Sequence, residues 1–207
     1  MNTARGMHAA TLLLNGKVLV TGGWNGSYLT STEIYDPVAN AWSSAGNMAV
    51  SRQNHAMTTL ADGKALVVGG QNPGSVARAE LYNPATGTWS SAGDMSTSRT
   101  NPIAVLLTNG KVLVAGGGNS GGVQASAELY DPAAITWSSA ASMIKSRMYH
   151  AAVRLTNGKV LVIGGGGDAV TQQSAEVYDP TANSWTLVAN LNVARGSGHT
   201  ATVLANG

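Results

Sequence analysis

Short apolar runs and alternating segments succeed one another along the whole chain. The run Val18–Val20 does not alternate and lies between an Asn-Gly pair and two glycines, which indicates a strand buried on both faces. In STEIYDP (31–37), Glu33 and Tyr35 fall on one face of an extended strand and Ile34 on the other. No segment has convincing helical periodicity. The pattern therefore predicts an all-β fold.

The same pattern is written four times. GKVLVTGG (16–23) returns as GKALVVGG (63–70), GKVLVAGG (110–117) and GKVLVIGG (158–165). Arginines begin successive copies at intervals of 47, 47, 48 and 48 residues, and each Tyr of YDP or YNP precedes a Trp by seven residues. We place repeats at 1–47, 48–94, 95–142 and 143–190, with a partial fifth at 191–207, all within one domain spanning 1–207.

Each repeat reads as four strands. In the first repeat they are HAATLLL (8–14), KVLVTGG (17–23), STEIYDP (31–37) and a short strand that carries Trp42. The Asn-Gly pair between the first two is a strong hairpin signal. Such a sheet cannot close a core alone, so it must stack on its neighbours, and radial stacking gives a β-propeller. We expect the paired glycines at a close backbone approach, and Tyr and Trp between the sheets.

The pattern RxxHAA…NGKVLVxGG…AEVYDPxxNxW resembles the kelch repeat in its bacterial, galactose-oxidase-related form, over essentially the whole chain. The resemblance implies a kelch-type β-propeller of four-stranded antiparallel blades, here four complete repeats plus the first strand of a fifth. It also implies that the first strand of each blade lines a central channel. Pro102 replaces the first-strand His in the third repeat, which suits a strand with one unpaired edge.

Charge and composition exclude several classes of function. The net charge is only +2 and the twelve Lys and Arg are dispersed, which argues against nucleic acid or an anionic membrane surface as a partner. No apolar run approaches the ~20 residues of a membrane span. Because the chain has no Cys, it forms no disulfide and has no thiolate chemistry. Similarity to exported bacterial kelch arrays favours an extracellular or cell-surface setting.

Most charged residues belong to the repeat itself. The repeat accounts for five Arg, four Lys, four Glu and three Asp, and Asp62 and Asp94 take turn positions. The exceptions are Arg78, Lys145, Arg154 and Asp168. So small a stock predicts no catalytic centre and no cofactor. The repeated Arg could hold an anion at a rim, but we favour a structural pair with the repeated Glu, because a carboxylate between blades needs a cationic partner.

Two further motifs are weighed and set aside. His8, His55, His150 and His199 occupy one slot on different blades, so we expect inter-blade histidines and no metal ring. The GGGG at 164–167 lacks the Lys-Ser/Thr ending and following helix of a phosphate-binding loop.

The loop after each glycine pair is the variable part of the repeat. The spacing from the second Gly to the Glu is 10, 10, 11 and 11 residues, and the contents differ freely. One interpretation is drift in unconstrained turns, and the other is a binding surface on a constant scaffold. The second predicts these ligand-binding residues: Trp24, Asn25, Tyr28, Gln71, Asn72, Arg78, Asn119, Gln124, Asp168 and Gln172.

We therefore expect a non-catalytic propeller that acts as a binding or assembly scaffold for a protein or a carbohydrate. Amide- and glycine-rich loops with an exposed aromatic residue suit such ligands. The alternative is a kelch-type sugar-processing enzyme similar to an epimerase. The resemblance also extends to copper radical oxidases, but those use a tyrosine cross-linked to cysteine, which this chain cannot form because it has no Cys.

Ring closure completes the expectations. Kelch rings normally have six or seven blades, and this sequence contains four complete repeats. We expect either a part of a longer array, which is slightly favoured, or a homo-oligomer in which two chains complete a ring of roughly eight blades.

Overall fold

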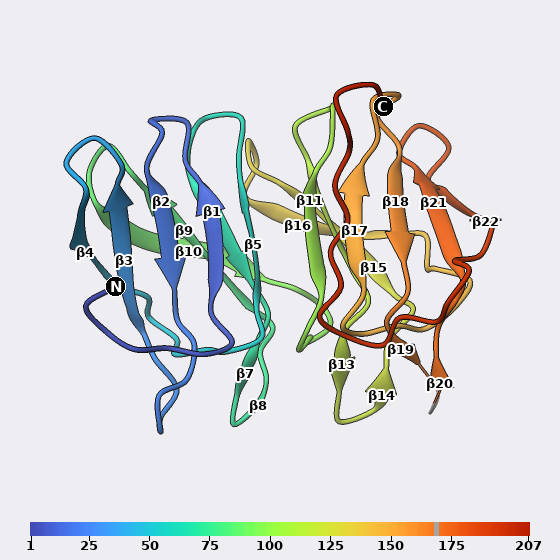
Figure 1. Ribbon diagram of the computed structural model, residues 1–207, viewed down its shortest axis with the longest axis horizontal. Coiled ribbons are helices and arrows are strands. Elements are labelled where there is room, and N and C mark those ends of the chain that lie inside the picture. The colour runs from blue at the N-terminus through green and yellow to red at the C-terminus, as the bar shows by residue number, and fades with distance from the viewer. Residues whose placement is uncertain (168–169) are drawn as a thin grey trace. The chain divides into compact units, whose positions relative to one another are not determined.

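Figure 1 shows the computed structural model of the chain, which describes residues 1–167 and 170–207. These residues form two compact parts, Met1–Thr100 and Asn101–Gly207. Each part holds two four-stranded antiparallel sheets, one from each repeat, as the sequence predicts. The described residues contain no helix that is long and apolar enough to cross a membrane.

The N-terminal part contains the first two repeat sheets, in the orders β1-β2-β3-β4 and β10-β9-β6-β5. A small hairpin, β7-β8, follows the second glycine pair. The bounds are β1 (Ala9–Leu12), β2 (Val18–Thr21), β3 (Ser31–Asp36), β4 (Ala41–Asn47), β5 (Ala56–Thr59), β6 (Ala65–Val68), β7 (Gln71–Asn72), β8 (Gly74–Ser75), β9 (Arg78–Asn83) and β10 (Thr88–Asp94).

The C-terminal part repeats this plan with sheets β11-β12-β15-β16 and β17-β18-β21-β22, and hairpins β13-β14 and β19-β20. The first strand is an edge in each sheet, which explains why Pro102 is tolerated just before β11. The bounds are β11 (Ile103–Leu106), β12 (Val112–Ala115), β13 (Gly118–Asn119), β14 (Gly122–Val123), β15 (Ala127–Asp131), β16 (Thr136–Ala140), β17 (Ala151–Arg154), β18 (Val160–Ile163), β19 (Gly166–Gly167), β20 (Val170–Thr171), β21 (Ala175–Asp179) and β22 (Ser184–Val188).

The second strand is wholly buried in the second and third repeats (β6 and β12), as its unbroken apolar run predicts. A tight turn sets the register of this strand against the first. In repeat one, the Leu13 N–H donates to Lys17 O (2.8 Å) and the Gly16 N–H donates to Leu13 O (3.0 Å). Gly16 adopts a φ of 79°, which a glycine accepts without steric cost.

Within each part the two sheets pack face to face through the repeated Tyr and Trp. In the N-terminal part, Leu19 and Ala45 of the first sheet share a core cluster with Ala65 and Tyr82 of the second. Trp89 packs against this cluster, and its indole N–H donates to Ala45 O (3.0 Å). Tyr82 and Trp89 therefore lie between the two sheets, as predicted.

The C-terminal part is built in the same way. Leu113 of the third sheet shares a cluster with Val160, Tyr178 and Trp185 of the fourth. The Trp185 indole N–H donates to Ala141 O across 2.8 Å. Trp185 is 9% exposed and belongs to the core cluster of its part, whereas Trp89 is only half-buried and packs against the cluster of its own.

The paired glycines mark close backbone approaches, as expected. Gly70 has a φ of +104°, and a Cβ built there would lie 2.8 Å from Gln53 O and 3.0 Å from His55 Cβ. Neither a side chain nor an ordinary backbone conformation fits at this position.

A buried Arg–Glu pair connects the strands of the first, second and fourth repeats. Arg52 and Glu80 have side chains 0% and 2% exposed, with 2.7 Å between Nη2 and Oε1. Arg52 Nη1 also donates to Gly69 O and Arg78 O, both at 2.8 Å. Equivalent pairs are Arg5–Glu33 (2.9 Å) and Arg147–Glu176 (2.7 Å). The structural interpretation of these charges is confirmed for the three pairs.

The same arginines also join neighbouring repeats through their backbones. The Arg52 N–H donates to Leu29 O (3.1 Å), and Arg52 O accepts from the Gly23 N–H (2.8 Å). Arg147 repeats this arrangement with Gln124 O and the Gly117 N–H. Each such arginine thus gives its backbone to the preceding repeat and its side chain to its own.

Surface Lys–Asp pairs close the other end of the sheets. Lys17 Nζ lies 2.9 Å from Asp36 Oδ2, and this hydrogen bond, with those from backbone N–H groups, lowers the pKa of Asp36. The second repeat has Asn83 in place of the Asp, and Lys64 instead pairs with Asp62 at 2.8 Å. The Asp62 carboxylate also accepts from the Lys64 N–H (3.1 Å), which confirms its predicted turn role.

Candidate functional site

The post-glycine loops lie at one end of each sheet. Because the four strands are antiparallel, the Asn-Gly and YDP turns fall at one end, and the glycine pair, its loop and the Arg–His segment fall at the other. Figure 1 shows the hairpins β7-β8, β13-β14 and β19-β20 projecting below the sheets that carry them. We call this end of each sheet its loop end.

The loops are attached to the scaffold by backbone bridges. Gly6 and Trp24 exchange two hydrogen bonds, from Trp24 N–H to Gly6 O (2.8 Å) and from Gly6 N–H to Trp24 O (2.9 Å). Gln53 bridges to Gln71, and Met148 to Gly166, in the same way. The backbone of the first loop residue is therefore held beside the Arg–His segment in these three repeats.

Trp24 and Tyr28 form the aromatic centre of the first loop. Their ring centroids are 4.8 Å apart with an interplanar angle of 72°, an edge-to-face contact. Trp24 remains 39% exposed although its backbone and one ring edge are held. Asn25, next in sequence, is exposed and its N–H donates to Ser27 O (3.3 Å). The three residues predicted to bind a ligand in this loop therefore lie close together.

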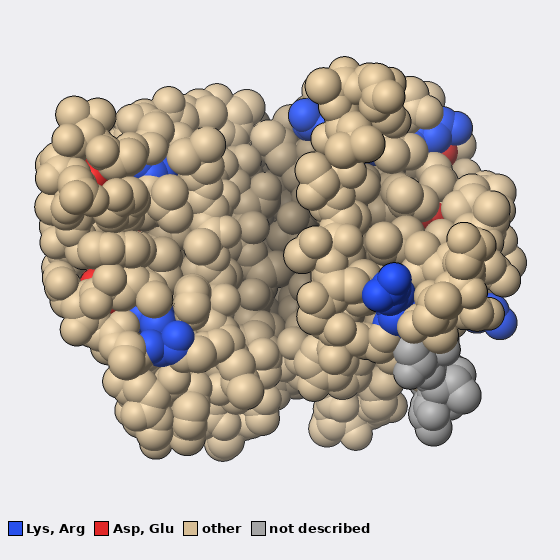
Figure 2. Space-filling model, viewed as in Figure 1, with Lys and Arg blue, Asp and Glu red and all other residues tan. Residues whose placement is uncertain are grey.

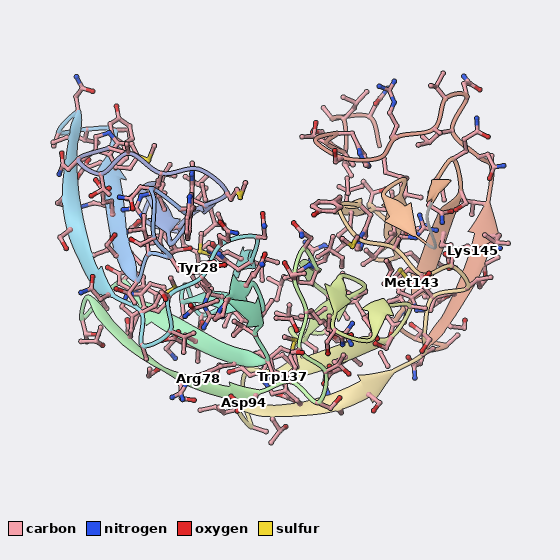
Figure 3. The ribbon with its side chains drawn as sticks, turned by 90° about the horizontal axis from the view of Figure 1, so that it is seen from below. Tyr28, Arg78, Asp94, Trp137, Met143 and Lys145 are labelled. Carbon is pink, nitrogen blue, oxygen red and sulfur yellow. The ribbon has the colours of Figure 1, made fainter. Side chains whose placement is uncertain are left out.

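The predicted residues of the second loop divide into two groups. Gln71 and Asn72 form β7, and the Asn72 amide donates to Ser51 Oγ across 2.7 Å. Arg78 is exposed and begins β9, where it is in register with Asp94 of β10. Figure 3 shows Arg78 and Asp94 together, apart from Tyr28. Arg78 is therefore the first residue of the inner strand β9 and does not belong to the loop tip.

In the third and fourth repeats, the predicted amides bond within their own loops. The Gln124 amide donates to Asn119 Oδ1 and to Gly122 O, both at 3.0 Å. Gln172 Oε1 accepts from Ser174 Oγ across 2.9 Å. Asp168 lies outside the described residues. The Gln124 amide thus holds the third loop from inside, and the tip of that loop is Ser120-Gly121.

The loop ends also contain residues that the sequence did not lead us to expect there. The residue before the first-strand His, or before Pro102 in the third repeat, adopts a left-handed conformation, with φ of 54° at Met7, 54° at Asn54, 52° at Asn101 and 58° at Tyr149. Met7 is 59% and Tyr149 45% exposed. Recurring Asn at one slot could have revealed the backbone conformation, because Asn tolerates it well. The structure thus adds two exposed apolar side chains to the loop ends.

Two of the first-strand histidines, His55 and His150, are buried between repeats. His55 Nε2 is 2.7 Å from Thr21 Oγ1 of the preceding repeat. Burial, then the positive charge of Arg52, lower the pKa of His55 to about 3, and burial with Arg147 does the same for His150. Both imidazoles are therefore neutral at physiological pH. Among the described residues, no cluster of His, Asp or Glu has the arrangement of a metal site.

The remaining charged residues do not converge on one site. Arg154 Nη1 donates to Leu106 O across 2.8 Å and so links two sheets. The exposed Lys145 gives its backbone N–H to Glu176, and Figure 3 places it in the C-terminal part near Met143. On the face in Figure 2, Lys and Arg appear as isolated patches among uncharged atoms. The described surface offers exposed aromatic and amide groups more than charge.

Comparison with known proteins agrees with this architecture. A family model described as the KLHDC2/KLHL20/DRC7 Kelch-repeats domain matches residues 7–207. No curated protein matches the chain. The structure of YjhT is similar with a TM-score of 0.76 and 17% identity, over 92% of this chain and 67% of that one.

A copper-bound fungal alcohol oxidase, described as belonging to the AA5 family, is similar with a TM-score of 0.60 and 20% identity. The match covers 94% of this chain and only 55% of the oxidase. At these identities the two structures share the fold and nothing further can be carried over. The chain belongs to the Kelch-repeat domain family, and its four-stranded antiparallel sheets are blades of the kelch-type β-propeller fold.

Proposed function

We propose that this chain is a non-catalytic binding module that contacts a carbohydrate or a protein ligand through its loop ends. The Kelch-repeat propeller fold supports a binding scaffold in general. The observation that carries the specific proposal is Trp24, an indole that is 39% exposed although its backbone and its neighbour Tyr28 hold it in place.

A held aromatic side chain is an efficient contact surface. The two backbone hydrogen bonds between Gly6 and Trp24 and the ring contact with Tyr28 restrict the indole before any ligand arrives. Binding then costs less side-chain entropy, which for a free side chain is about 0.5–1.5 kcal/mol. The exposed indole face offers stacking to an apolar ring face, and the indole edge offers an N–H donor.

The ligand should be polar but not strongly charged. The first loop, WNGSYLTS, contains no charged residue, and the neighbouring Arg5 is buried, with both of its Nη atoms bonded to Glu33, Gly22 O and Ser31. Exposed Asn25 and Ser27 supply amide and hydroxyl groups that match the hydroxyl and amide groups of a sugar or a peptide.

The same structure gives little support to acid–base catalysis. Arg52 and Glu80 are sealed in an ion pair, and His55 is buried with its pKa lowered to about 3. The alternative, a sugar-processing enzyme, would need Arg78 or Asp168, the charged residues outside the repeat pattern in or beside the variable loops.

Glycan and peptide arrays test the proposal. The full chain should bind a subset of neutral glycans or peptides, and Trp24→Ala should lose that binding without losing stability. The matched control is Val38→Ala, which trims a 95% exposed side chain in the β3–β4 turn, at the opposite end of the same sheet. Equal binding by wild type and Trp24→Ala would exclude the first loop as the contact surface.

Turnover separates the binder from the enzyme. Each glycan that binds is followed by NMR for a change in its anomeric signals or covalent structure. We expect none. If a glycan is converted by the wild type and not by Arg78→Ala or Asp168→Ala, the protein is an enzyme and the proposal of a non-catalytic binding module is wrong.

A further inference from the structure

The Asn-Gly pairs of this chain fall into two structural classes. The Asn-Gly and Asp-Gly pairs look equivalent in the sequence, but the glycine N–H is hydrogen-bonded in the turn pairs and not in the loop pair of the described structure. The turn glycines Gly16, Gly63, Gly110, Gly158 and Gly207 each donate this N–H to the carbonyl of the leucine three residues earlier, over 2.9–3.1 Å. Asn25-Gly26, in the first post-glycine loop, stands apart from them.

The turn asparagines are also held by their side chains. Asn15 Oδ1 accepts from the Lys17 N–H (3.2 Å), and Asn109 and Asn157 accept in the same way from Lys111 and Lys159 (3.1 Å each). Both the amide carbonyl and the following N–H are thus occupied, which holds each pair in a single turn geometry.

Asn25 lacks these restraints within the described structure. The Gly26 N–H has no hydrogen-bond acceptor among the described residues, and a Cβ built on Gly26 would meet no atom within 4 Å. Asn25 Oδ1 accepts from the Ser27 hydroxyl at 3.5 Å, the outer limit of such a bond. Both residues are exposed.

We propose that Asn25 is a site of spontaneous deamidation, selected by the fold from among the Asn-Gly pairs. The Gly26 nitrogen attacks Asn25 Cγ, its proton passes to water or buffer, and the side-chain nitrogen leaves as ammonia, which gives a five-membered succinimide. Water then opens either carbonyl to give aspartate or isoaspartate at position 25. One water is consumed and one ammonia released, with no change of oxidation state.

The product places a carboxylate in a loop that has no charged residue, directly beside the exposed Trp24. Opening to isoaspartate also lengthens the backbone by one methylene next to the Gly6–Trp24 bridge. The inference does not depend on the proposed function, because it concerns the chemistry of the loop whatever the loop binds.

Peptide mapping of the folded chain tests the inference. After incubation in mildly alkaline buffer, trypsin separates Asn25 (peptide 18–52) from Asn15 (6–17), Asn109 (100–111) and Asn157 (155–159). The mass gain of amide-to-acid conversion should accumulate at Asn25 about tenfold faster than at the three turn sites. A turn must first lose a hydrogen bond of about 1 kcal/mol and its fixed geometry, and 1.36 kcal/mol corresponds to tenfold.

The same chain unfolded in urea is the matched control. The four sites should then deamidate at similar rates, because each has glycine next. Asn25→Gln should abolish the modification of peptide 18–52 in the folded protein. Equal rates at Asn25 and the turn sites in the folded chain would overturn the inference, and so would a preference for Asn25 that persists in urea.

Discussion

Arg52 and Glu80 form an ion pair of 2.7 Å with almost no solvent contact, inside a sheet whose second strand is wholly buried. Glu80 also accepts hydrogen bonds from the Ala49 N–H (2.6 Å) and the Val50 N–H (3.2 Å). The pair thus closes a network of backbone and side-chain groups that would otherwise be buried without partners.

Removing one partner of this pair should be costly. Arg52→Met leaves the Glu80 carboxylate buried without its cation, which we expect to lower the free energy of unfolding by about 3–5 kcal/mol in urea titrations. The control is Lys17→Met, which breaks the exposed Lys17–Asp36 pair and should have a much smaller effect. Similar losses in the two variants would contradict a structural role for the buried pair.

Stability should fall in mild acid because of the buried histidines. The pKa of His55 is about 3 in the folded chain and near 6.5 in a model peptide, so between these values the unfolded chain binds more protons. The contribution is complete above about pH 6.5, and below it each such histidine costs up to about 1.4 kcal/mol per pH unit.

The variant His55→Gln isolates this effect. Gln cannot gain a proton, so the loss of unfolding free energy from about pH 7.5 to about pH 5 should be smaller than in the wild type. Urea titrations at the two pH values give both slopes. Parallel slopes would mean that His55 is protonated as readily in the folded chain as in the unfolded one.

Ile135 offers a stabilising substitution. It is a β-branched residue with a φ of 56°, at the slot where Asn40, Gly87 and Asn183 stand in the other repeats. Ile135→Asn should relieve the left-handed strain and raise the free energy of unfolding by about 1–2 kcal/mol. Thermal and urea unfolding measure the gain.

The reciprocal change, Asn183→Ile, should destabilise the chain. Asn183 Oδ1 accepts from Tyr178 Oη and from the Ala141 N–H, both at 2.9 Å, so isoleucine there loses two hydrogen bonds and acquires the strain. If Ile135→Asn were neutral or harmful, the left-handed backbone at this slot would not be the source of strain that we infer.

The close approach at the paired glycines can be tested in the second repeat. Gly70→Ala should destabilise the chain by about 1–3 kcal/mol or more, because its Cβ would press on Gln53 O in a left-handed conformation. Gly74→Ala is the matched control, since a Cβ there meets nothing within 4 Å. Equal unfolding free energies for the two variants would show that a Cβ at position 70 fits without steric conflict.

Much of the fold could be predicted from the sequence because each signal is written four times. The buried second strand, the close approach at the paired glycines and the Arg–Glu pairs all follow from residues that recur at one slot. Repetition separates the scaffold from the loops and so isolates Trp24 and Tyr28. The degree of burial of the tryptophans was harder to predict from the sequence, because it depends on how far each indole extends across the neighbouring sheet.

The loop ends were harder to predict because their structure depends on partners that composition does not reveal. Gln124 and Asn119 are ordinary polar residues in sequence, but they bond to each other. Arg78 was assigned to the loop, although the following strand already begins at that residue. Met7 and Tyr149 gave no warning of a left-handed backbone, since neither residue type favours it.

The double attachment of the repeated arginine bears on how such chains grow. The backbones of Arg52 and Arg147 bond to the preceding repeat, and their side chains bond to their own repeat. The partners stand at equivalent positions in both cases. A duplicated segment of one period, inserted in phase, would meet donors and acceptors that already match on both of its borders. Gene duplication could therefore lengthen the array by whole repeats. An insertion out of phase would leave a buried guanidinium without its hydrogen-bond partners.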